Sequence, residues 1–339
     1  MTVLNQRIRL ASRPVGVPKP EDFLQDEVPI PEPREGELLL RTLYLSLDPY
    51  MRGRMSDAKS YAKPLAIGDV MVGGTVAEIV VSKAPGFRAG QLVVAYGGWQ
   101  SFSIAKPREL RVLDPDAAPV TTALGVLGMP GFTAYAGLLA IGRPREGETV
   151  AVAAASGPVG ATVGQLAKLN GCTAVGIAGG PEKVAYLKTI GFDVALDHRA
   201  GDLRASLKEA VPQGIDVYFE NVGGAVWDAV LPRLNTYARV PVCGLAATYN
   251  ATKLPEGPDR SGALMGQVLT KSLLLRGFIQ SEFYEALHDD FLRDMTRWVR
   301  VGKVKYREDI TEGLERAPEV FAGMLQGRNF GKAIIKVAD

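Results

Sequence analysis

The segment at residues 149–164, TVAVAAASGPVGATVG, constrains the fold of this chain more than any other. Residues 149–154 are β-branched or small and apolar, which is typical of a parallel strand buried on both faces. The chain must then turn sharply at Gly157 and Gly160, where the missing Cβ allows a tight turn and a close approach of a ligand to the backbone. Gly164 allows the next helix to lie close to the strand. The segment therefore predicts a strand, a glycine turn and a helix in direct succession.

The N-terminus of that helix presents unpaired backbone N–H groups, which suit an anion. The spacing A-x-x-G-x-x-G, from Ala154 to Gly160, is a variant of the G-x-G-x-x-G fingerprint and is weak evidence when it stands alone. A second strand at residues 172–178 and a second helix at residues 183–190 complete a βαβ unit around it. We therefore predict a domain that holds a dinucleotide by its pyrophosphate.

The end of the second strand indicates which dinucleotide is preferred. In NAD-binding domains an Asp or Glu about 20 residues beyond the glycine turn bonds the ribose 2′-hydroxyl. Here Gly179 and Gly180 stand at that point, Lys183 follows, and His198 and Arg199 come after the third predicted strand. A site with cations and no acid suits a 2′-phosphate, so NADP is favoured over NAD. The alternative is that Lys183 and Arg199 are solvated surface cations.

The length of 339 residues exceeds that at which single cores usually stop growing, so two domains are expected. Residues 1–122 are rich in proline and carry short predicted strands at 38–45, 74–81, 92–96 and 101–104. From residue 123 onward strands alternate with helices, and the chain ends in a strand at 332–337. The fold class is α/β: a doubly wound Rossmann sheet that binds NADP at 123–300, and a β-rich catalytic domain from 1–122 and 301–339.

Charge and metal-ligand content argue against other classes of protein. The net charge is +2 and mixed along the chain, with no basic stripe of the kind that follows nucleic acid, so no nucleic-acid partner is expected. The two cysteines, Cys172 and Cys243, and the two histidines, His198 and His288, do not have the close spacing of a zinc site, so no metal is expected. His288 lies beside two aspartates in a helical segment and is expected at the surface.

The first ten residues, MTVLNQRIRL, lack the apolar core of a signal peptide, and no run of 18 apolar residues occurs anywhere. We therefore expect no membrane association and a cytoplasmic location. The apolar run at residues 272–279 predicts an edge strand that pairs with its twin in a homodimer. The alternative is that a local loop covers this edge.

Seven segments, in order along nearly the whole chain, resemble the zinc-independent medium-chain dehydrogenase/reductases: LSLDPYMRGRM (45–55), GMPGFTAYAGL (128–138), AAASGPVGATVGQLAKLNGC (153–172), KVAYLKTIGFD (183–193), YFENVGG (218–224), CGLAATYN (243–250) and GRNFGKAIIKV (327–337). They are most similar to the leukotriene B4 12-hydroxydehydrogenase/15-oxoprostaglandin 13-reductase branch, which includes plant alkenal double-bond reductases and bacterial curcumin reductases. The resemblance implies that the β-rich catalytic domain is GroES-like.

The resemblance also implies a metal-independent reaction on a small-molecule enone or enal. NADPH gives a hydride to the β-carbon of an α,β-unsaturated aldehyde or ketone, and the enolate that forms is then protonated. The protein has to position the cofactor against the alkene and stabilise the charge that grows on the carbonyl oxygen.

By resemblance, Tyr249 in CGLAATYN is the catalytic residue, whose hydroxyl bonds the nicotinamide ribose or the enolate oxygen. A phenol with an ordinary pKa of about 10 stays protonated at neutral pH and can donate to an oxyanion. The alternative is a structural tyrosine in a loop. Tyr50 and Arg52, in LDPYMRG, are similar to the family's substrate-cleft loop, where an aromatic ring covers a conjugated substrate. Packing for Tyr50, and bonding to backbone carbonyls for Arg52, are the alternatives.

The glycine turn and the resemblance together predict one set of cofactor-binding residues. They are Thr133, Ser156, Gly157, Val159, Gly160, Gly179, Lys183, His198, Asn221, Cys243, Tyr249, Phe278, Asn329 and Gly331. An asparagine presents a donor and an acceptor together, which suits a carboxamide or a ribose. The chain departs from the family pattern at two points. Before the predicted phosphate-binding lysine, Lys183, the branch often has Ser or Asp, whereas this chain reads GGPEK. His198 stands where the branch often has a Tyr that contacts the phosphate.

Two other functions would use the same cofactor domain. A quinone or carbonyl reductase of the same superfamily would differ only in its substrate, and the joint presence of LDPYMRG and CGLAATYN favours alkene reduction instead. A non-catalytic NADPH-binding protein is the second alternative, because a fold alone does not imply an activity. The presence of Tyr249 together with a complete phosphate-binding turn argues against it.

Overall fold

The computed structural model describes residues 3–253 and 257–339, and the chain divides into two compact units. Unit 1 comprises Met1–Gly125 and Glu308–Asp339, and unit 2 comprises Val126–Arg307. Residues 301–307 stay with unit 2 because the Gln165 side chain holds them there. Its amide nitrogen donates to the Lys305 carbonyl at 2.8 Å, and its oxygen accepts from the Lys305 N–H at 2.7 Å.

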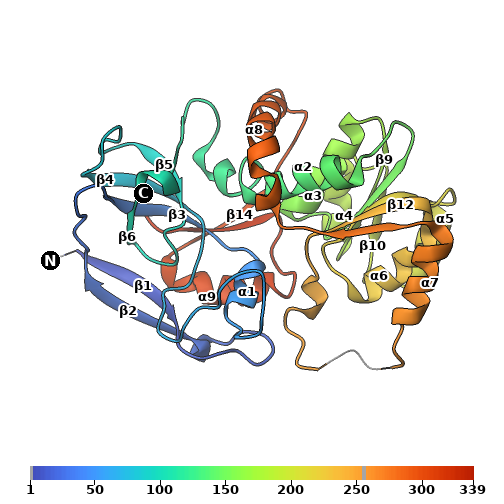
Figure 1. The fold of residues 1–339 in the computed structure, drawn as a ribbon, viewed down its shortest axis with the longest axis horizontal. Coiled ribbons are helices and arrows are strands. Elements are labelled where there is room, and N and C mark those ends of the chain that lie inside the picture. The colour runs from blue at the N-terminus through green and yellow to red at the C-terminus, as the bar shows by residue number, and fades with distance from the viewer. Residues whose placement is uncertain (1–2, 254–256) are drawn as a thin grey trace. The chain divides into compact units, whose positions relative to one another are not determined.

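Unit 2 is built on a six-stranded parallel sheet with the order β10-β9-β8-β11-β12-β13 (Figure 1). The strands are β8 (Thr149–Ala153), β9 (Thr173–Ala178), β10 (Val194–Asp197), β11 (Ile215–Phe219), β12 (Leu234–Val242) and β13 (Leu274–Gly277). In chain order this is 3-2-1-4-5-6, the order of the doubly wound Rossmann fold, and the strand order reverses between β8 and β11. The structure confirms the predicted parallel sheet, with all five residues of β8 buried.

Helices cover both faces of this sheet, as right-handed crossovers require (Figure 1). They are α2 (Met129–Ala136), α3 (Pro158–Leu169), α4 (Pro181–Thr189), α5 (Leu203–Ala210), α6 (Gly224–Val230), α7 (Ser261–Lys271) and α8 (Tyr284–Arg300). Leu207 of α5 and Val230 of α6 are fully buried in one core with Val175 of β9. The apolar run at 272–279 forms β13 at the edge of the sheet, as expected.

Unit 1 is β-rich, as the sequence predicted. Its main sheet has the order β14-β15-β3-β4-β5-β7, with β6 paired to β3, and a separate hairpin joins β1 to β2. The elements are β1 (Leu4–Leu10), β2 (Phe23–Pro29), β3 (Leu38–Ser46), α1 (Tyr50–Arg54), β4 (Thr75–Ser82), β5 (Leu92–Ala95), β6 (Phe102–Ala105), β7 (Arg111–Val112), β14 (Glu308–Glu312), α9 (Ala317–Met324) and β15 (Lys332–Lys336). The C-terminal strand β15 pairs with β3, so the end of the chain completes the N-terminal sheet.

Two glycines of the 149–164 segment have different roles in the structure. A Cβ on Gly160 would lie 2.5 Å from the Ala154 carbonyl oxygen, so this position allows the tight turn that was predicted. A Cβ on Gly164 would lie 1.9 Å from Cζ of Phe192. The expectation for Gly164 therefore needs correction: the space that it leaves is filled by an aromatic ring, rather than by close approach of the helix to the strand.

A second expectation, that His288 lies at the surface, is also wrong. The His288 ring is half-buried on α8, where it stacks on Tyr284 with 4.0 Å between ring centroids. It also meets Phe132 of α2 edge-on at 5.3 Å. The histidine thus contributes to the aromatic packing of α8 against α2. No helix of the described residues is long and apolar enough to cross a membrane.

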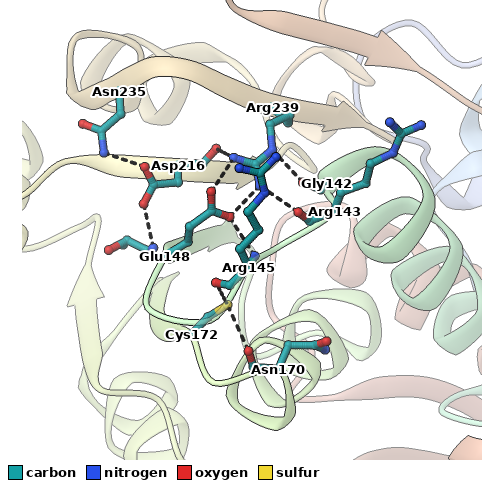
Figure 2. Close-up of polar contacts among 10 residues, drawn as sticks. Gly142, Arg143, Arg145, Glu148, Asn170, Cys172, Asp216, Asn235 and Arg239 are labelled. Carbon is teal, nitrogen blue, oxygen red and sulfur yellow. Dashed lines mark hydrogen bonds and ion pairs between the residues drawn. The ribbon is translucent and has the colours of Figure 1, made fainter.

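A polar network closes the amino-terminal side of the sheet in unit 2 (Figure 2). Both terminal nitrogens of Arg239 contact the carboxylate of Glu148, at 3.0 and 2.6 Å, and its Nε donates to the Gly142 carbonyl at 2.8 Å. Asp216 accepts from the Thr149 N–H, also at 2.8 Å. Burial alone raises the pKa of Glu148, but hydrogen bonds from Arg239 and the Arg145 N–H bring it below its ordinary value. This network stabilises the starts of β8 and β11.

Candidate functional site

The carboxyl ends of the six parallel strands carry every predicted cofactor-binding residue of unit 2 except Thr133. Those residues are Ser156, Gly157, Val159 and Gly160 after β8, Gly179 and Lys183 after β9, His198 after β10, Asn221 after β11, Cys243 and Tyr249 after β12, and Phe278 after β13. In open α/β sheets ligands bind outside these ends, at the point where the strand order reverses. The fold thus brings residues spread over more than a hundred positions to one edge of the sheet.

The turn after β8 has the geometry of an anion-binding site. Ala154 has a φ of +49°, which few non-glycine residues adopt, and its carbonyl accepts from the Gly157 N–H at 3.0 Å. Gly157 is then the residue before α3, with Val159 in its first turn, so the first N–H groups of the helix have no partner within the helix. Ser156 is 7 % exposed in this turn.

Cations gather at the end of β9. A Cβ on Gly179 would lie 2.8 Å from Nε2 of His198 and 2.7 Å from Nε of Arg199, so both side chains lie against this glycine. Lys183 is in the first turn of α4. Desolvation lowers the pKa of His198, and the charges of Arg199 and Lys183 lower it further. The lowered pKa leaves the His198 ring neutral near pH 7, so Arg199 and Lys183 supply the positive charge that could receive an anion.

An acid that contacts this turn, Asp197, is at the end of β10 rather than of β9. Its Oδ1 accepts from the Gly180 and Arg199 N–H groups, each at 2.9 Å, and these bonds lower its pKa. Asp197 therefore fixes the turn that carries the cations. No Asp or Glu stands at Gly179 or Gly180, the position of the ribose-binding acid in NAD-dependent domains.

Asn221 connects the strand ends at the point where the strand order reverses. Its Nδ2 donates to the Ala153 carbonyl at the end of β8, at 2.9 Å. Its Oδ1 accepts from the Cys243 thiol, which follows β12, at 2.8 Å. Burial raises the pKa of that thiol, so Cys243 stays neutral and acts as a donor.

Glu220, next to Asn221, belongs to this edge and was missed by the sequence analysis. It is 2 % exposed, and its Oε1 accepts from the N–H groups of Val222 and Gly223 at 2.7 and 2.9 Å and from the Tyr218 hydroxyl at 3.2 Å. Burial raises the pKa of the Glu220 carboxyl. The sequence signal was an acid directly after the apolar strand at 215–219.

Tyr249 ends a short 3₁₀ turn, Ala246–Thr248, beyond β12. Its hydroxyl oxygen accepts from the Leu245 N–H at 3.2 Å, and a Cβ on Gly244 would lie 3.0 Å from it. The hydroxyl is therefore held over the loop that leaves β12, on the same edge of the sheet as Asn221.

Two further predicted residues of unit 2 are mainly packed. Thr133, 8 % exposed on α2, donates its hydroxyl to the Met129 carbonyl at 2.8 Å, one turn earlier in the same helix. Phe278, 6 % exposed, meets Phe219 edge-on with 6.2 Å between centroids. The one hydroxyl proton of Thr133 is thus used within the helix, so this hydroxyl can accept a hydrogen bond from a ligand but has no proton left to donate.

In unit 1, Tyr50 begins α1 and is half-buried. Desolvation raises the pKa of its phenol, and the nearby Asp48 carboxylate raises it further, so the hydroxyl stays protonated. Arg52 is 7 % exposed, and its Nη2 donates to the carbonyls of Pro14 and Gly16 at 3.1 and 3.0 Å. These contacts support the alternative considered for Arg52, in which it holds the loop through backbone carbonyls.

Asn329 and Gly331 form the turn before β15. The Asn329 side chain donates to the Gly331 carbonyl at 2.8 Å, and Gly331 has a φ of +94°, a conformation that favours glycine. Neither unit, over residues 3–253 and 257–339, contains a group of three His, Cys, Asp or Glu side chains placed to hold a metal ion.

Comparison with known proteins extends these observations. Residues 6–113 match a family model described as the N-terminal domain of oxidoreductase, and residues 158–293 match one described as zinc-binding dehydrogenase. The chain is 56 % identical over 335 residues to the NADPH-dependent curcumin reductase of Escherichia coli (strain K12), covering 98 % of this chain and 97 % of that protein. The chain belongs to the medium-chain dehydrogenase/reductases.

This dehydrogenase/reductase is also 44 % identical to prostaglandin reductase 1 of Bos taurus, over 95 % of this chain and 96 % of that one. It is 40 % identical to the NADP⁺-dependent 2-alkenal reductase of Nicotiana tabacum, over 99 % and 98 % of the two chains. The branch suggested by the sequence motifs is therefore confirmed. Although one family model is named for zinc, the described residues of this dehydrogenase/reductase offer no set of ligands that fits a zinc ion.

Solved structures confirm the fold class. CurA from Vibrio vulnificus in complex with NADPH superposes with a TM-score of 0.96 and 53 % identity, over 98 % of this chain and 99 % of that one. A quinone oxidoreductase of Pseudomonas syringae pv. Tomato DC3000 shares only 19 % identity, at a TM-score of 0.76 and over 98 % and 99 % of the two chains, and shows the fold alone. This dehydrogenase/reductase thus has the Rossmann and GroES-like architecture of its family.

Proposed function

We propose that this chain is an NADPH-dependent reductase of the carbon–carbon double bond of α,β-unsaturated aldehydes and ketones. The observation that carries the proposal is the similarity over nearly the whole chain to proteins named curcumin, prostaglandin and 2-alkenal reductase. The site agrees with it, because one edge of a Rossmann sheet combines an anion-binding turn, a cluster of cations and a tyrosine hydroxyl.

The residues at this edge fit NADPH. The turn from Ala154 to Gly160 would hold the pyrophosphate at the start of α3. Gly179, backed by His198 and Arg199 and followed by Lys183, would receive the 2′-phosphate, since a glycine leaves room there that any side chain would fill. The same space and the absence of an acid argue against a preference for NADH.

The remaining predicted residues of unit 2 would hold the other end of the cofactor: Thr133, Asn221, Cys243 and Phe278. In unit 1, Asn329 and Gly331 keep the cofactor role that the resemblance gives them. Asn221 is fixed by two hydrogen bonds of its own, so its position is set before a ligand arrives. When bound, NADPH supplies the hydride for the reduction. The protein would hold and orient the cofactor and the substrate and exclude water, and it would do so with groups that are already in place.

Tyr249 is the residue that we assign to the chemistry. As a phenol it can donate a hydrogen bond to the substrate oxygen on which negative charge grows, or to the ribose, and can help deliver a proton. Tyr50 would cover a conjugated substrate with its ring. Arg52 would keep the Tyr50 loop in place through Pro14 and Gly16.

The roles of the two units and the assembly follow as further parts of the proposal. Unit 2 would be the NADP-binding domain and unit 1 the catalytic domain. The edge strand β13, with Leu274 47 % exposed, would pair with its twin in a cytoplasmic homodimer. Light scattering that shows only monomers at working concentration would contradict the dimer.

The experiment is to follow NADPH absorbance with a panel of enones and enals, with the same panel and NADH, and with saturated ketones and quinones. Oxidation of NADPH that depends on a conjugated alkene and yields the saturated carbonyl product would support the proposal. Turnover of quinones or saturated ketones alone would favour a quinone or carbonyl reductase. Tight NADPH binding without turnover would favour a binding protein.

A further inference from the structure

Unit 1 contains a buried ion pair that none of the roles above uses. Nζ of Lys332, on β15, lies 3.0 Å from Oδ1 of Asp48, and the two side chains are 3 % and 7 % exposed. The same ammonium donates to the Leu47 carbonyl at 2.5 Å. Ser46 donates its hydroxyl to the other carboxylate oxygen of Asp48. The lysine and the aspartate are 284 residues apart in the chain.

A buried ion pair usually stabilises a core no better than apolar side chains of similar size. Taking two charges out of water costs several kcal/mol per ion, and well-packed apolar residues of similar size are often as stabilising or more so. Burial lowers the pKa of Lys332, and Asp48 raises it again by charge and hydrogen bonding. Glu308, on β14, is the other acid whose charge acts on this lysine. The pair is therefore better explained by the geometry that it imposes than by stability.

The two segments that the pair joins are those that carry the predicted site residues of unit 1. Asp48 stands two residues before Tyr50, where α1 begins, and its carbonyl accepts from the Met51 N–H at 3.1 Å. Lys332 directly follows Gly331, the last residue of the turn that begins at Asn329. One ammonium group thus connects the start of the substrate loop to the end of the cofactor-binding turn.

We propose that Lys332 is a positioning residue for the reduction, whose ammonium fixes the backbone of Leu47 and Asp48 and so places Tyr50 for the substrate. The inference rests on the proposed function, because it takes the site roles of Tyr50 and Gly331 from there. Lys332 acts through the loop and does not itself touch the substrate.

The loop has other supports, so removing the pair should leave the fold intact. The Leu47 N–H donates to the Ala333 carbonyl at 3.2 Å, and β3 pairs with β15 immediately before the loop. These bonds hold the end of β3 but not the carboxylate or the carbonyl that face Lys332. Loss of the ammonium therefore loosens Leu47 and Asp48 at the start of the loop, while the sheet remains and Arg52 still holds the later part of the loop.

The test is the neutral pair Asp48→Asn with Lys332→Met, which removes both charges of the pair together, keeps an acceptor for Ser46, and leaves the half-buried Glu308 as the remaining acid beside it. Lys336→Met is the matched control: it makes the same change four residues later on β15, where the lysine pairs at the surface with Asp339. Melting temperature, the Kd for NADPH, and the KM and kcat with a bulky enone are measured for each variant and for Tyr50→Ala.

For the neutral pair we expect a melting temperature within about 3 °C of the wild type, and an NADPH Kd that changes less than about twofold because the predicted phosphate-binding residues belong to unit 2 and are unchanged. We expect kcat/KM for the enone to fall by about tenfold, since a small misplacement of a positioning group has effects of this size. Lys336→Met should match the wild type in all four quantities.

The outcomes separate this inference from the proposed function. If the neutral pair keeps kcat/KM within about twofold while Tyr50→Ala lowers it, Lys332 is not a positioning residue. If neither changes kcat/KM, the role of Tyr50 fails, and the inference with it. Absence of enone turnover by the wild type overturns both. If the neutral pair does not fold, Asp48→Asn alone weakens the hold of the Lys332 ammonium on residue 48, and an unchanged kcat/KM for that variant would contradict the inference.

Discussion

The Phe192 ring packs against Gly164 and Gly176. For the substitution Gly164→Ala, helix propensity and tertiary packing therefore predict effects of opposite sign on the free energy of unfolding. Gly164 lies inside α3, where replacing glycine by alanine ordinarily stabilises a helix by about 1 kcal/mol. The added Cβ would, however, lie 1.9, 2.3 and 2.5 Å from three carbons of the Phe192 ring. Carbon atoms pack at about 3.5 to 4.0 Å, so the ring would have to retreat by roughly 1.5 Å.

The ring has little room to move. Phe192 is 5 % exposed, and two of its ring carbons, Cδ1 and Cε1, lie 2.8 Å from the position that a Cβ on Gly176 of β9 would take. Cδ1 of Leu187 lies 2.7 Å from the same position, so the space over Gly176 is already filled. Overpacking a closed site costs about 1 to 3 kcal/mol, and the upper end applies here. After the gain in helix propensity, Gly164→Ala should lower the free energy of unfolding by about 2 kcal/mol.

The assay is urea unfolding followed by far-UV circular dichroism, with midpoints compared at equal slope. Gly266→Ala is the control, because Gly266 lies inside α7 with nothing within 4 Å of its Cβ position, and it should stabilise by about 1 kcal/mol. Phe192→Leu should destabilise by about 1 to 2 kcal/mol when introduced alone, and should rescue Gly164→Ala in the double variant. Additivity of the two changes within about 0.5 kcal/mol would refute the packing argument.

Three further predictions concern the site and its support. Tyr249→Phe should lower kcat/KM for an enone by about 10²-fold with little change in the NADPH Kd, and unaltered kinetics would make Tyr249 structural. Gly179→Asp places a carboxylate against His198 and Arg199, so the Kd for NADPH should rise by at least about tenfold while that for NADH changes less; parallel changes in titration calorimetry would contradict the phosphate site. Arg239→Met should destabilise unit 2 by about 2 to 3 kcal/mol at pH 7. Since the folded-state pKa of Glu148 lies below its unfolded value, this difference is present above about pH 4.3 and is lost as the pH falls through the folded pKa, which melting curves across that range would show.

The architecture of unit 2 was predictable because its signals are local. A buried parallel strand is a continuous apolar run, and a glycine turn into a helix has a fixed spacing, so the strands near 149–154 and 172–178 and the helix near 183–190 could be located within a few residues. Right-handed crossovers then limit the possible strand orders, and the structure shows which of them this chain adopts. The same reasoning gathers the candidate residues, since the carboxyl ends of parallel strands share one edge.

The sequence also identified candidate residues that lie within a motif. It did not identify which distant residues their side chains contact. Arg52 was a candidate for the substrate and instead donates to Pro14 and Gly16, more than thirty residues earlier. Glu220 drew no attention in the sequence, yet its carboxylate holds the turn beside Asn221. Neither contact leaves a periodic trace, because a hydrogen bond between distant segments depends on which surfaces the fold brings together.

By itself, the sequence determined the fold class, the glycine turn between the strand at 149–154 and the following helix, the absence of an acid at Gly179 and the family, all of which depend on residues close to one another in the chain. Only the tertiary structure decided that Gly164 makes room for Phe192, that His288 packs among aromatic rings and that Lys332 meets Asp48 in the core. The physical reason is the range of the interactions: spacing encodes backbone geometry over a few residues, whereas close packing selects partners across the whole chain.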